Sequence, residues 1–225
     1  MSGKLVIFDL DGTLLNTIGD LSAAVNHALG LRGLPMHGED EYLKMVGYGV
    51  RRLVQDALPE CHRGDEEYVD AVLHDFRKYY VSHIDCLTRP YGGMVELAGM
   101  LASEGFSLAV ASNKFQRGAE ILVERFFPDL EFVAVCGNSP ELPLKPDPAL
   151  VEHIMDLAGS SRESTVMVGD SGTDMLTAAN AGIFAIGVSW GFRPAADLAA
   201  AGADAVVATP ARLHEVILRH FGMKQ

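Results

Sequence analysis

The chain has 225 residues, of which 48% are hydrophobic and 21% charged, and its formal net charge is −12 at pH 7. This length suits one large globular domain, or a core domain with a smaller appendage. An acidic chain without a basic run is a poor candidate for binding nucleic acid or anionic membranes. No apolar stretch approaches the roughly 18 residues of a membrane-spanning helix. These properties are typical of a soluble globular protein.

The cysteines and the N-terminal residues favour a reducing compartment. Cys61, Cys86 and Cys136 lie far apart and form no C-x-x-C pair. An odd number leaves one thiol unpaired in any disulfide scheme. Asp9 and Asp11 interrupt the N-terminal stretch where a secretory signal peptide needs an unbroken apolar segment. We therefore predict a cytoplasmic protein.

The first predicted element is a strand over residues 4–8, and a long helical region follows it. Residues 17–86 contain three apolar stripes at helical spacing and no convincing strand. The stripes comprise Leu21, Ala24, Val25, Ala28 and Leu29; Val50, Leu53, Val54, Ala57 and Leu58; and Val69, Val72, Leu73, Phe76 and Tyr80. A connection of this length is too long for a simple loop. We predict an inserted helical subdomain over residues 16–86, with linkers at 16–19 and 89–93.

Beyond residue 87, apolar runs alternate with amphipathic segments. The runs predict strands at residues 107–111, 132–136, 165–168, 184–188 and 205–207. Strands that alternate with helices imply a parallel sheet covered on both faces. We therefore predict an α/β fold, a doubly wound, Rossmann-like parallel sheet formed by residues 1–15 and 87–225, into which the helical subdomain is inserted.

Two aspartates follow the first predicted strand in the stretch VIFDLDGTLLNT. Asp9 closes the strand, and Asp11 lies in a turn that Gly12 permits. Thr13 can hydrogen-bond an anion or cap the following segment. Ligands of open parallel sheets bind beyond the carboxyl ends of the strands, so these residues are candidates for a site. A turn with two solvated aspartates is the alternative, whereas a calcium loop is disfavoured by the strand-like residues before it.

Three further stretches carry polar side chains just beyond later strands. Ser112 and Asn113 follow the strand at 107–111, and Ser112 could contact an oxyanion. Lys145 lies in the proline-rich stretch PLKPDP, which limits its freedom. Asp170 and Asp174 lie in VGDSGTDM, the first in a turn and the second at a helix start. Each stretch alone is also compatible with ordinary loop chemistry.

Together, these stretches predict a phosphoryl site at one edge of the sheet. Several carboxylates cannot gather there unless a cation neutralises them. Carboxylate and carbonyl oxygens suit Mg²⁺. The combination of Mg²⁺, a lysine and a hydroxyl is suited to binding a phosphoryl group.

The motifs FDLDGTLL, ASN, LKPDP and VGDSGTDM, in this order, resemble those of phosphatases of the haloacid dehalogenase superfamily. The resemblance covers essentially the whole chain. It implies that Asp9 is a nucleophile that forms an aspartyl-phosphate. It also implies that Asp11 protonates the leaving oxygen and then activates water.

The resemblance further implies a set of ligands. Mg²⁺ would be held by Asp9, by the backbone carbonyl of Asp11 and by Asp170. Ser112 and Lys145 would hold the phosphoryl oxygens. Gly12, Thr13, Asn113 and Asp174 would support the phosphate and the metal. The predicted helical subdomain resembles the cap of this family, which closes over small phosphorylated metabolites.

One stretch of the predicted cap, VGYGVRR, is a candidate for binding the substrate. Gly47 and Gly49 expose backbone N–H groups before a helix, which favours an anion. Arg51 could add a charged clamp. The glycine pattern resembles that of phosphoglycolate phosphatases, so 2-phosphoglycolate is the predicted substrate. A helix-starting turn with solvated arginines is the alternative.

Other functions remain open at this point. Hydrolases of sugar phosphates, nucleotides or pyrophosphate, and phosphosugar mutases, belong to the same superfamily. Asn16 stands where many members carry an acidic residue, which slightly disfavours the mutases. A phospho-accepting receiver domain also combines clustered acids, a hydroxyl, a lysine and Mg²⁺, but lacks a large helical insert. For the oligomeric state we expect a monomer or a homodimer.

Overall fold

The protein, described over residues 3–223 in a computed structural model, is built on one parallel sheet. Its strands are β1 (Leu5–Phe8), β4 (Ser107–Phe115), β5 (Phe132–Asn138), β6 (Thr165–Gly169), β7 (Phe184–Val188) and β8 (Ala205–Val207). They lie in the order β5-β4-β1-β6-β7-β8, and all their pairings are parallel. The chain reverses direction across the sheet beside β1, so β1 and its neighbours end at the topological switch point where ligands bind.

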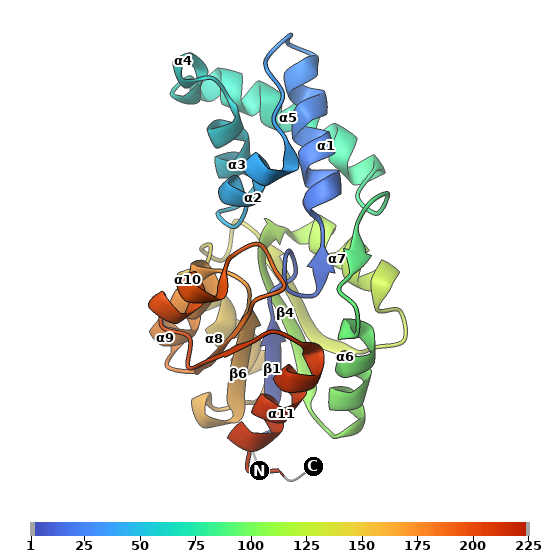
Figure 1. The fold of residues 1–225 in the computed structure, drawn as a ribbon, viewed down its shortest axis with the longest axis vertical. Coiled ribbons are helices and arrows are strands. Elements are labelled where there is room, and N and C mark those ends of the chain that lie inside the picture. The colour runs from blue at the N-terminus through green and yellow to red at the C-terminus, as the bar shows by residue number, and fades with distance from the viewer. Residues whose placement is uncertain (1–2, 224–225) are drawn as a thin grey trace.

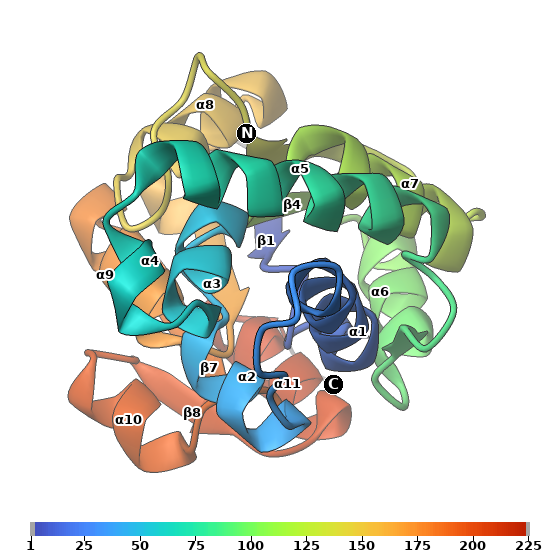
Figure 2. The same cartoon turned by 90° about the horizontal axis from the view of Figure 1, so that it is seen from above.

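The helices fall into two groups, one above the sheet and one around it (Figures 1 and 2). The first group is α1 (Ile18–Gly30), α2 (Glu39–Met45), α3 (Val50–Ala57), α4 (Glu60–Arg63) and α5 (Glu66–Ser82). The second is α6 (Met94–Ser103), α7 (Gln116–Phe126), α8 (Ala149–Ala158), α9 (Gly172–Ala181), α10 (Ala195–Ala200) and α11 (Pro210–His220), with a 3₁₀ turn at Arg162–Ser164. Within residues 3–223, no helix is both long and apolar enough to cross a membrane.

The sheet is buried on both faces because its side chains alternate between two hydrophobic clusters. Val6 and Phe8 of β1 pack with α6, α7 and α11, whereas Leu5 and Ile7 pack with α8, α9 and α10. All four side chains are fully buried, which explains why β1 is an uninterrupted apolar run. The predicted doubly wound α/β fold is confirmed.

Two predicted boundaries differ from the structure. The strand predicted to end at residue 111 continues to Phe115, but its register with β5 shifts between Ala111 and Phe115. Residues 112–114 therefore leave the regular pairing while remaining extended. The predicted linker at 16–19 is shorter, because β2 (Leu15–Asn16) pairs antiparallel with β3 (Arg89–Pro90) and α1 already begins at Ile18.

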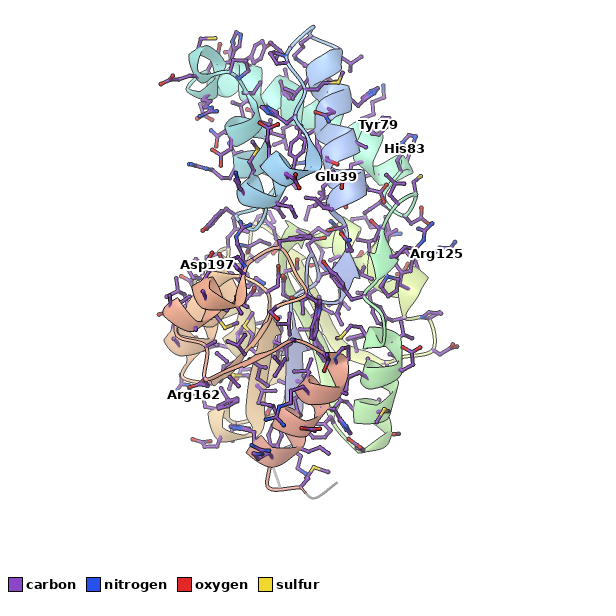
Figure 3. The ribbon with its side chains drawn as sticks, in the orientation of Figure 1. Glu39, Tyr79, His83, Arg125, Arg162 and Asp197 are labelled. Atoms are coloured by element: carbon purple, nitrogen blue, oxygen red, sulfur yellow. The ribbon has the colours of Figure 1, made fainter. Side chains whose placement is uncertain are left out.

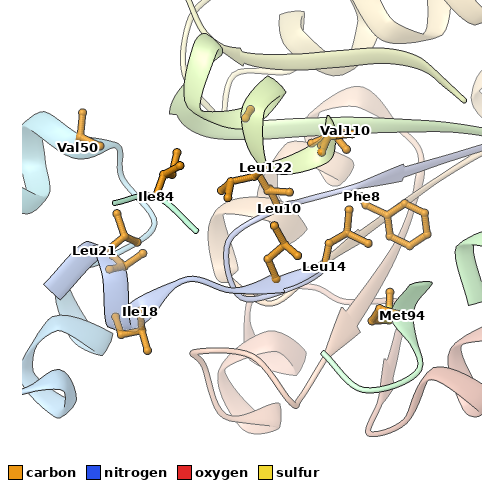
Figure 4. Packing of buried hydrophobic residues seen from close by; sticks show 14 of the residues in the cluster. Phe8, Leu10, Leu14, Ile18, Leu21, Val50, Ile84, Met94, Val110 and Leu122 are labelled. Atoms are coloured by element: carbon orange, nitrogen blue, oxygen red, sulfur yellow. The ribbon is translucent and has the colours of Figure 1, made fainter. Parts of the chain in front are cut away.

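Helices α1–α5, here called the cap helices, lie over the edge where β1 ends (Figure 1). The three predicted apolar stripes form the buried faces of α1, α3 and α5. The short helices α2 and α4 were not predicted, because neither presents an apolar stripe. Figure 4 shows Leu21 on the side of the cap helices and Leu14 on the side of the sheet, and both belong to one hydrophobic cluster, so the cap helices and the sheet share a continuous apolar contact.

A buried carboxylate joins the two chain segments that connect the cap helices to the sheet. Asp20 of α1 is 2% exposed. Its carboxylate accepts hydrogen bonds from Leu87 N at 2.9 Å, from Thr88 N at 2.7 Å and from Thr88 Oγ1 at 2.7 Å. On the outer side, Arg125 of α7 (Figure 3) pairs with Asp85 at 3.1 Å. The first set of contacts holds the two ends of the cap segment together, and the second ties the later end to α7.

Candidate active site

Three aspartates meet where β1 and β6 end side by side. Asp9 follows β1, Asp170 follows β6, and Asp174 lies in the first turn of α9. One carboxylate oxygen from each lies within 4.8 Å of the others, and all three residues are buried. Lys145 Nζ donates to Asp9 Oδ1 at 2.8 Å and to Asp174 Oδ1 at 2.6 Å. The structure thus brings together four of the residues singled out in the sequence.

The charges of this cluster are strongly coupled. Burial raises the pKa of Asp9, Lys145 partly opposes this and Asp174 adds to it, so that the pKa is about 7. Burial and the charges of Asp9 and Asp174 raise the pKa of Asp170 as well. Burial would lower the pKa of Lys145, but Asp174 and Asp9 outweigh it and raise that pKa. Three carboxylates against one ammonium leave an excess of negative charge that favours a bound cation.

Glycines allow the aspartates to approach this closely. A Cβ on Gly12, whose φ is +91°, would lie 2.3 Å from Asp170 Oδ2. A Cβ on Gly191 would lie 2.3 Å from both Asp170 Cβ and Gly12 O, and one on Gly169 would lie 2.3 Å from Asp174 Cβ. Such distances are impossible for real side chains, so any larger residue at these positions would displace an acidic group.

Asp11 forms an ion pair with a second lysine, Lys114. Lys114 Nζ donates to Asp11 Oδ1 at 3.0 Å and to Oδ2 at 3.3 Å. The same ammonium donates to the hydroxyl of Tyr80, in α5, at 2.6 Å. Burial would lower the pKa of Lys114, but Asp11 and Tyr80 outweigh it and raise that pKa. The two aspartates of the FDLD motif are therefore paired with two different lysines.

The remaining predicted residues of the core act mostly as supports in this structure. Thr13 Oγ1 donates to Asp170 Oδ1 at 3.2 Å. Asn113 Oδ1 accepts from Lys145 N at 2.9 Å, and Asn113 Nδ2 donates to Lys145 O at 3.1 Å. Ser112 is 2% exposed and lines the cavity beside the cluster. Asn113 thereby fixes the segment that carries the buried lysine.

A cavity lies between this cluster and the cap helices. It occupies about 590 Å³, including the open solvent at its mouth. Its polar wall comprises Asp9, Asp11, Ser112, Asn113, Lys114, Lys145, Asp170, Ser171, Asp174 and Arg193. Leu21, Val46, Val50, Leu53 and Phe192 form its apolar wall, with Gly47 and Gly49 between them. The space suits a small polar molecule whose charged end faces the sheet.

The cap residues predicted from the sequence separate in space. Gly47 and Gly49 line the cavity, and Gly47 O accepts from Asn113 Nδ2 at 3.0 Å. The side chain of Arg51 is 41% exposed, pairs with Glu66 and Asp70, and is not part of the cavity wall. The structure therefore does not bring Arg51 to the site. Its position on the first turn of α3 directs it toward α5.

Several residues of the site were missed from the sequence. Arg193 lines the cavity and donates to the carbonyl oxygens of Leu43 and Val46 at the end of α2. Phe192 N donates to Asp170 Oδ2 at 2.7 Å. The stretch 189–193 follows β7 at the same edge of the sheet, so its position was a usable signal. Tyr80 carried no such signal, because it reads as one more apolar residue of a helical stripe.

The residues present fit a hard divalent cation. The donor set consists of oxygens, as Mg²⁺ prefers. The excess of buried carboxylates requires a positive charge. The close approach of Asp170 to Gly12 places it beside Asp9 without an intervening side chain. Asp9 and Asp170 are the carboxylates we expect to hold the ion, because Asp174 is engaged by Lys145, Ser171 N and Ser171 Oγ.

The fold and the acidic cluster define a hydrolase of one known class. Residues 6–188 match the family model for haloacid dehalogenase-like hydrolases, and the chain belongs to this family. A phosphoglycolate phosphatase from Mesorhizobium japonicum is 33% identical over 85% of each chain. Phosphoglycolate phosphatase 1 of Pseudomonas aeruginosa is 35% identical over 86% of this chain and 73% of its own. The prediction of a phosphatase enzyme is confirmed.

Solved structures support the same assignment. A protein from Lactobacillus delbrueckii subsp. bulgaricus, proposed to be a phosphoglycolate phosphatase, superposes with a TM-score of 0.88 at 32% identity. The match covers 96% of this chain and 99% of that one. The similarity therefore includes the cap helices as well as the sheet.

Mg²⁺ is expected to stabilise the protein against heat, and replacing Gly12 by alanine is expected to abolish this effect, because the new Cβ displaces Asp170. The measurement is Tm with and without Mg²⁺. Gly105→Ala is the matched control, since its φ is +86° and nothing lies within 4 Å of an added Cβ. Both variants should lose roughly 1–2 kcal/mol of stability because alanine is strained at positive φ, but only Gly12→Ala should lose the Mg²⁺ response. Equal responses would contradict the assignment of Asp170 to the metal.

Proposed function

We propose that the protein is a Mg²⁺-dependent phosphomonoesterase that acts through an aspartyl-phosphate on Asp9, with 2-phosphoglycolate as its substrate. The observation that carries the proposal is the placement of Asp9. Its carboxylate faces the cavity, accepts a hydrogen bond from Lys145, and lies within 4.8 Å of two further carboxylates. An isolated aspartate would repel a phosphate dianion, whereas this arrangement can hold one.

In the proposed reaction, Asp9 attacks the phosphorus atom and the bond from phosphorus to the ester oxygen breaks. Asp11 donates a proton to that oxygen, which leaves as an alcohol. Asp11 then accepts a proton from a water molecule, which attacks the phosphorus of the aspartyl-phosphate and releases inorganic phosphate. The structure supports these roles, since both carboxylates line one cavity from opposite ends of a three-residue segment.

The phosphoryl oxygens would be bound by Lys145 and Ser112, which lie on the same side of the cavity. Lys145 is held by Asp9, Asp174 and the carbonyl oxygen of Ala111, so its ammonium is fixed before the substrate binds. Mg²⁺, held by Asp9, Asp170 and the carbonyl oxygen of Asp11, would neutralise charge on the transferring group. Preorganised charge of this kind is the usual source of phosphoryl-transfer catalysis.

We propose that residues 16–86 act as a cap on a core of residues 1–15 and 87–225. The cap helices supply the apolar wall of the cavity, which excludes water from the reacting groups. The relatives named phosphoglycolate phosphatases support 2-phosphoglycolate as the substrate. The small cavity with Gly47 and Gly49 on its cap side also suits a short, anionic molecule.

A hydrolase of sugar phosphates, nucleotides or pyrophosphate, or a phosphosugar mutase, would use the same core residues. A receiver-like domain would accept a phosphoryl group without turning over. The free thiols of Cys61, Cys86 and Cys136 support the proposed cytoplasmic location. We retain a monomer or a homodimer as the proposed state.

A panel of phosphate esters tests this function. We expect kcat/KM to be highest for 2-phosphoglycolate, to vanish with a chelator and to return with Mg²⁺. If kcat/KM were far higher for hexose phosphates or nucleotides than for 2-phosphoglycolate, the proposed substrate would be wrong, but the assignment as a phosphatase would stand. Phosphorylation of the chain without steady-state release of phosphate would favour the receiver-like reading instead.

A further inference from the structure

We propose that Lys114 determines the substrate class by binding a carboxylate on the leaving group. This inference rests on the proposed phosphatase function and concerns the part of the substrate that is not transferred. The starting observation is that the ammonium of Lys114 lies in the cavity wall, next to Asp11, and is held there by a residue of the cap.

The cationic side chains of the cavity wall include one candidate for binding the end of the substrate that is not transferred. Within the described residues, Lys114, Lys145 and Arg193 are the cationic side chains that line it. Lys145 lies against Asp9, the proposed nucleophile, and is assigned to the transferred phosphoryl group. Arg193 donates to the carbonyl oxygens at the end of α2. Lys114 is the cation that lies beside Asp11, the group proposed to protonate the leaving oxygen, and is therefore the candidate for binding the non-transferred end of a substrate.

The ammonium of Lys114 is held in position, and one of its hydrogen bonds is long. It has three N–H donors. Among residues 3–223 it makes three hydrogen bonds, two to the carboxylate oxygens of Asp11, of which the longer is 3.3 Å, and one to the hydroxyl of Tyr80. Its side chain is 1% exposed, so water does not compete freely for the donor that makes the long bond to Asp11 Oδ2. A carboxylate on the leaving group would replace this long bond by a charge-assisted hydrogen bond to the same ammonium.

The position of Lys114 matches the geometry of a carboxylated leaving group. Asp11 must lie within about 2.6–3.2 Å of the ester oxygen to transfer a proton to it. Lys114 Nζ is 3.0 Å from Asp11 Oδ1. In 2-phosphoglycolate only one carbon separates the ester oxygen from the carboxylate, so that carboxylate comes to lie beside Lys114. A longer or neutral leaving group would not pair with the ammonium in this way.

Tyr80 makes the binding of this carboxylate depend on the cap. The ring of Tyr80 stacks on Phe76 with the two ring centroids 5.3 Å apart. Lys114 Nζ lies 4.7 Å from the ring centroid of Tyr80. Burial raises the pKa of Tyr80, so its hydroxyl stays neutral. Tyr80 belongs to α5, whereas Lys114 belongs to β4. Contact of the cap helices with the sheet thus positions the ammonium, and Tyr80 is a positioning residue.

The first test compares two esters that differ in the carboxylate. For Lys114→Met we expect kcat/KM to fall about 100-fold or more for 2-phosphoglycolate, and about 10-fold for ethyl phosphate, where only the contact with Asp11 is lost. Arg51→Ala is the matched control, because its cation lies outside the cavity, and it should change neither value appreciably. An equal loss on the two esters would overturn the proposal.

The second test measures binding without turnover. 3-Phosphonopropionate replaces the ester oxygen of 2-phosphoglycolate by a methylene, and propylphosphonate also lacks the carboxylate. In calorimetry with Mg²⁺, the wild-type protein should bind the first at least about 10-fold more tightly, and Lys114→Met should remove this preference. A preference that survives in Lys114→Met would assign the carboxylate to another group.

A milder variant, Tyr80→Phe, keeps the proposal testable if Lys114→Met fails to fold. Tyr80→Phe keeps the ring stack with Phe76 and removes one hydrogen bond to Lys114. It should reduce the preference for 3-phosphonopropionate by several-fold, with an unchanged circular dichroism spectrum. A wild-type protein that hydrolyses no ester would refute the proposed function. A wild-type protein that hydrolyses both esters, with Lys114→Met and Tyr80→Phe leaving their ratio unchanged, would refute this inference alone.

Discussion

Asp9→Asn is expected to abolish hydrolysis of every phosphate ester, by at least about 10⁴-fold in kcat. The amide has no carboxylate oxygen with which to attack phosphorus. The fold should survive, because the amide has the size of the carboxylate and still offers an oxygen to Lys145. It also removes one of the three buried negative charges. The measurement is steady-state phosphate release, together with Tm.

The exposed Asp129→Asn is the control for this variant, since it makes the same chemical change on the surface. It should keep full activity. Activity of Asp9→Asn within tenfold of the wild type, at an unchanged Tm, would show that Asp9 is not the nucleophile. A loss of activity accompanied by a lower Tm would instead show that the charge of Asp9 is needed for folding.

Lys145→Met is expected to lower both stability and activity. Methionine matches the length of the side chain but leaves Asp9 and Asp174 buried without their partner. Removing one member of a buried ion pair costs about 3–5 kcal/mol. For a chain of this size, this corresponds to a loss of roughly 10 °C in Tm. We expect kcat to fall by about 10³-fold or more, because the phosphoryl group loses its fixed cation.

Mg²⁺ distinguishes the electrostatic cause from a simple packing defect. It should recover more Tm in Lys145→Met than in the wild-type protein, because it neutralises the carboxylates that the lysine leaves unpaired. The exposed Lys44→Met is the control and should lower neither Tm nor kcat. A Tm of Lys145→Met within 2 °C of the wild type would contradict the charge argument.

The sequence was sufficient for the sheet and for the core of the site. Short apolar runs such as the one ending at Phe8 can be buried on both faces only in a covered parallel sheet. The carboxyl ends of parallel strands meet at one edge, so Asp9 and Asp170 could be placed together without coordinates. Lys145 was recognisable because prolines flank it. These inferences depend on local spacing and on a general rule of sheet topology.

The boundary of β4 could not be predicted in the same way. Ser112, Asn113 and Lys114 were expected in a loop, but they stay extended while the pairing with β5 shifts. A change of register depends on two strands distant in sequence, and no local pattern reports it. The shift matters for the site, because Ser112 and Lys114 of this irregular segment both line the cavity.

The amino-acid sequence alone determined the fold class and the acidic cluster, since each follows from periodicity or from position at a strand end, and its motifs named a nucleophile candidate through their resemblance to a known family. Only the tertiary structure decided which cations line the cavity. Arg51 was a reasonable candidate, yet it pairs with Glu66 and Asp70 on the outer side of the cap helices. Lys114 was not singled out in the sequence, and only the structure places Tyr80 and Asp11 around it. The direction of a long side chain is set by the elements that pack around it, and that packing joins residues far apart in the chain.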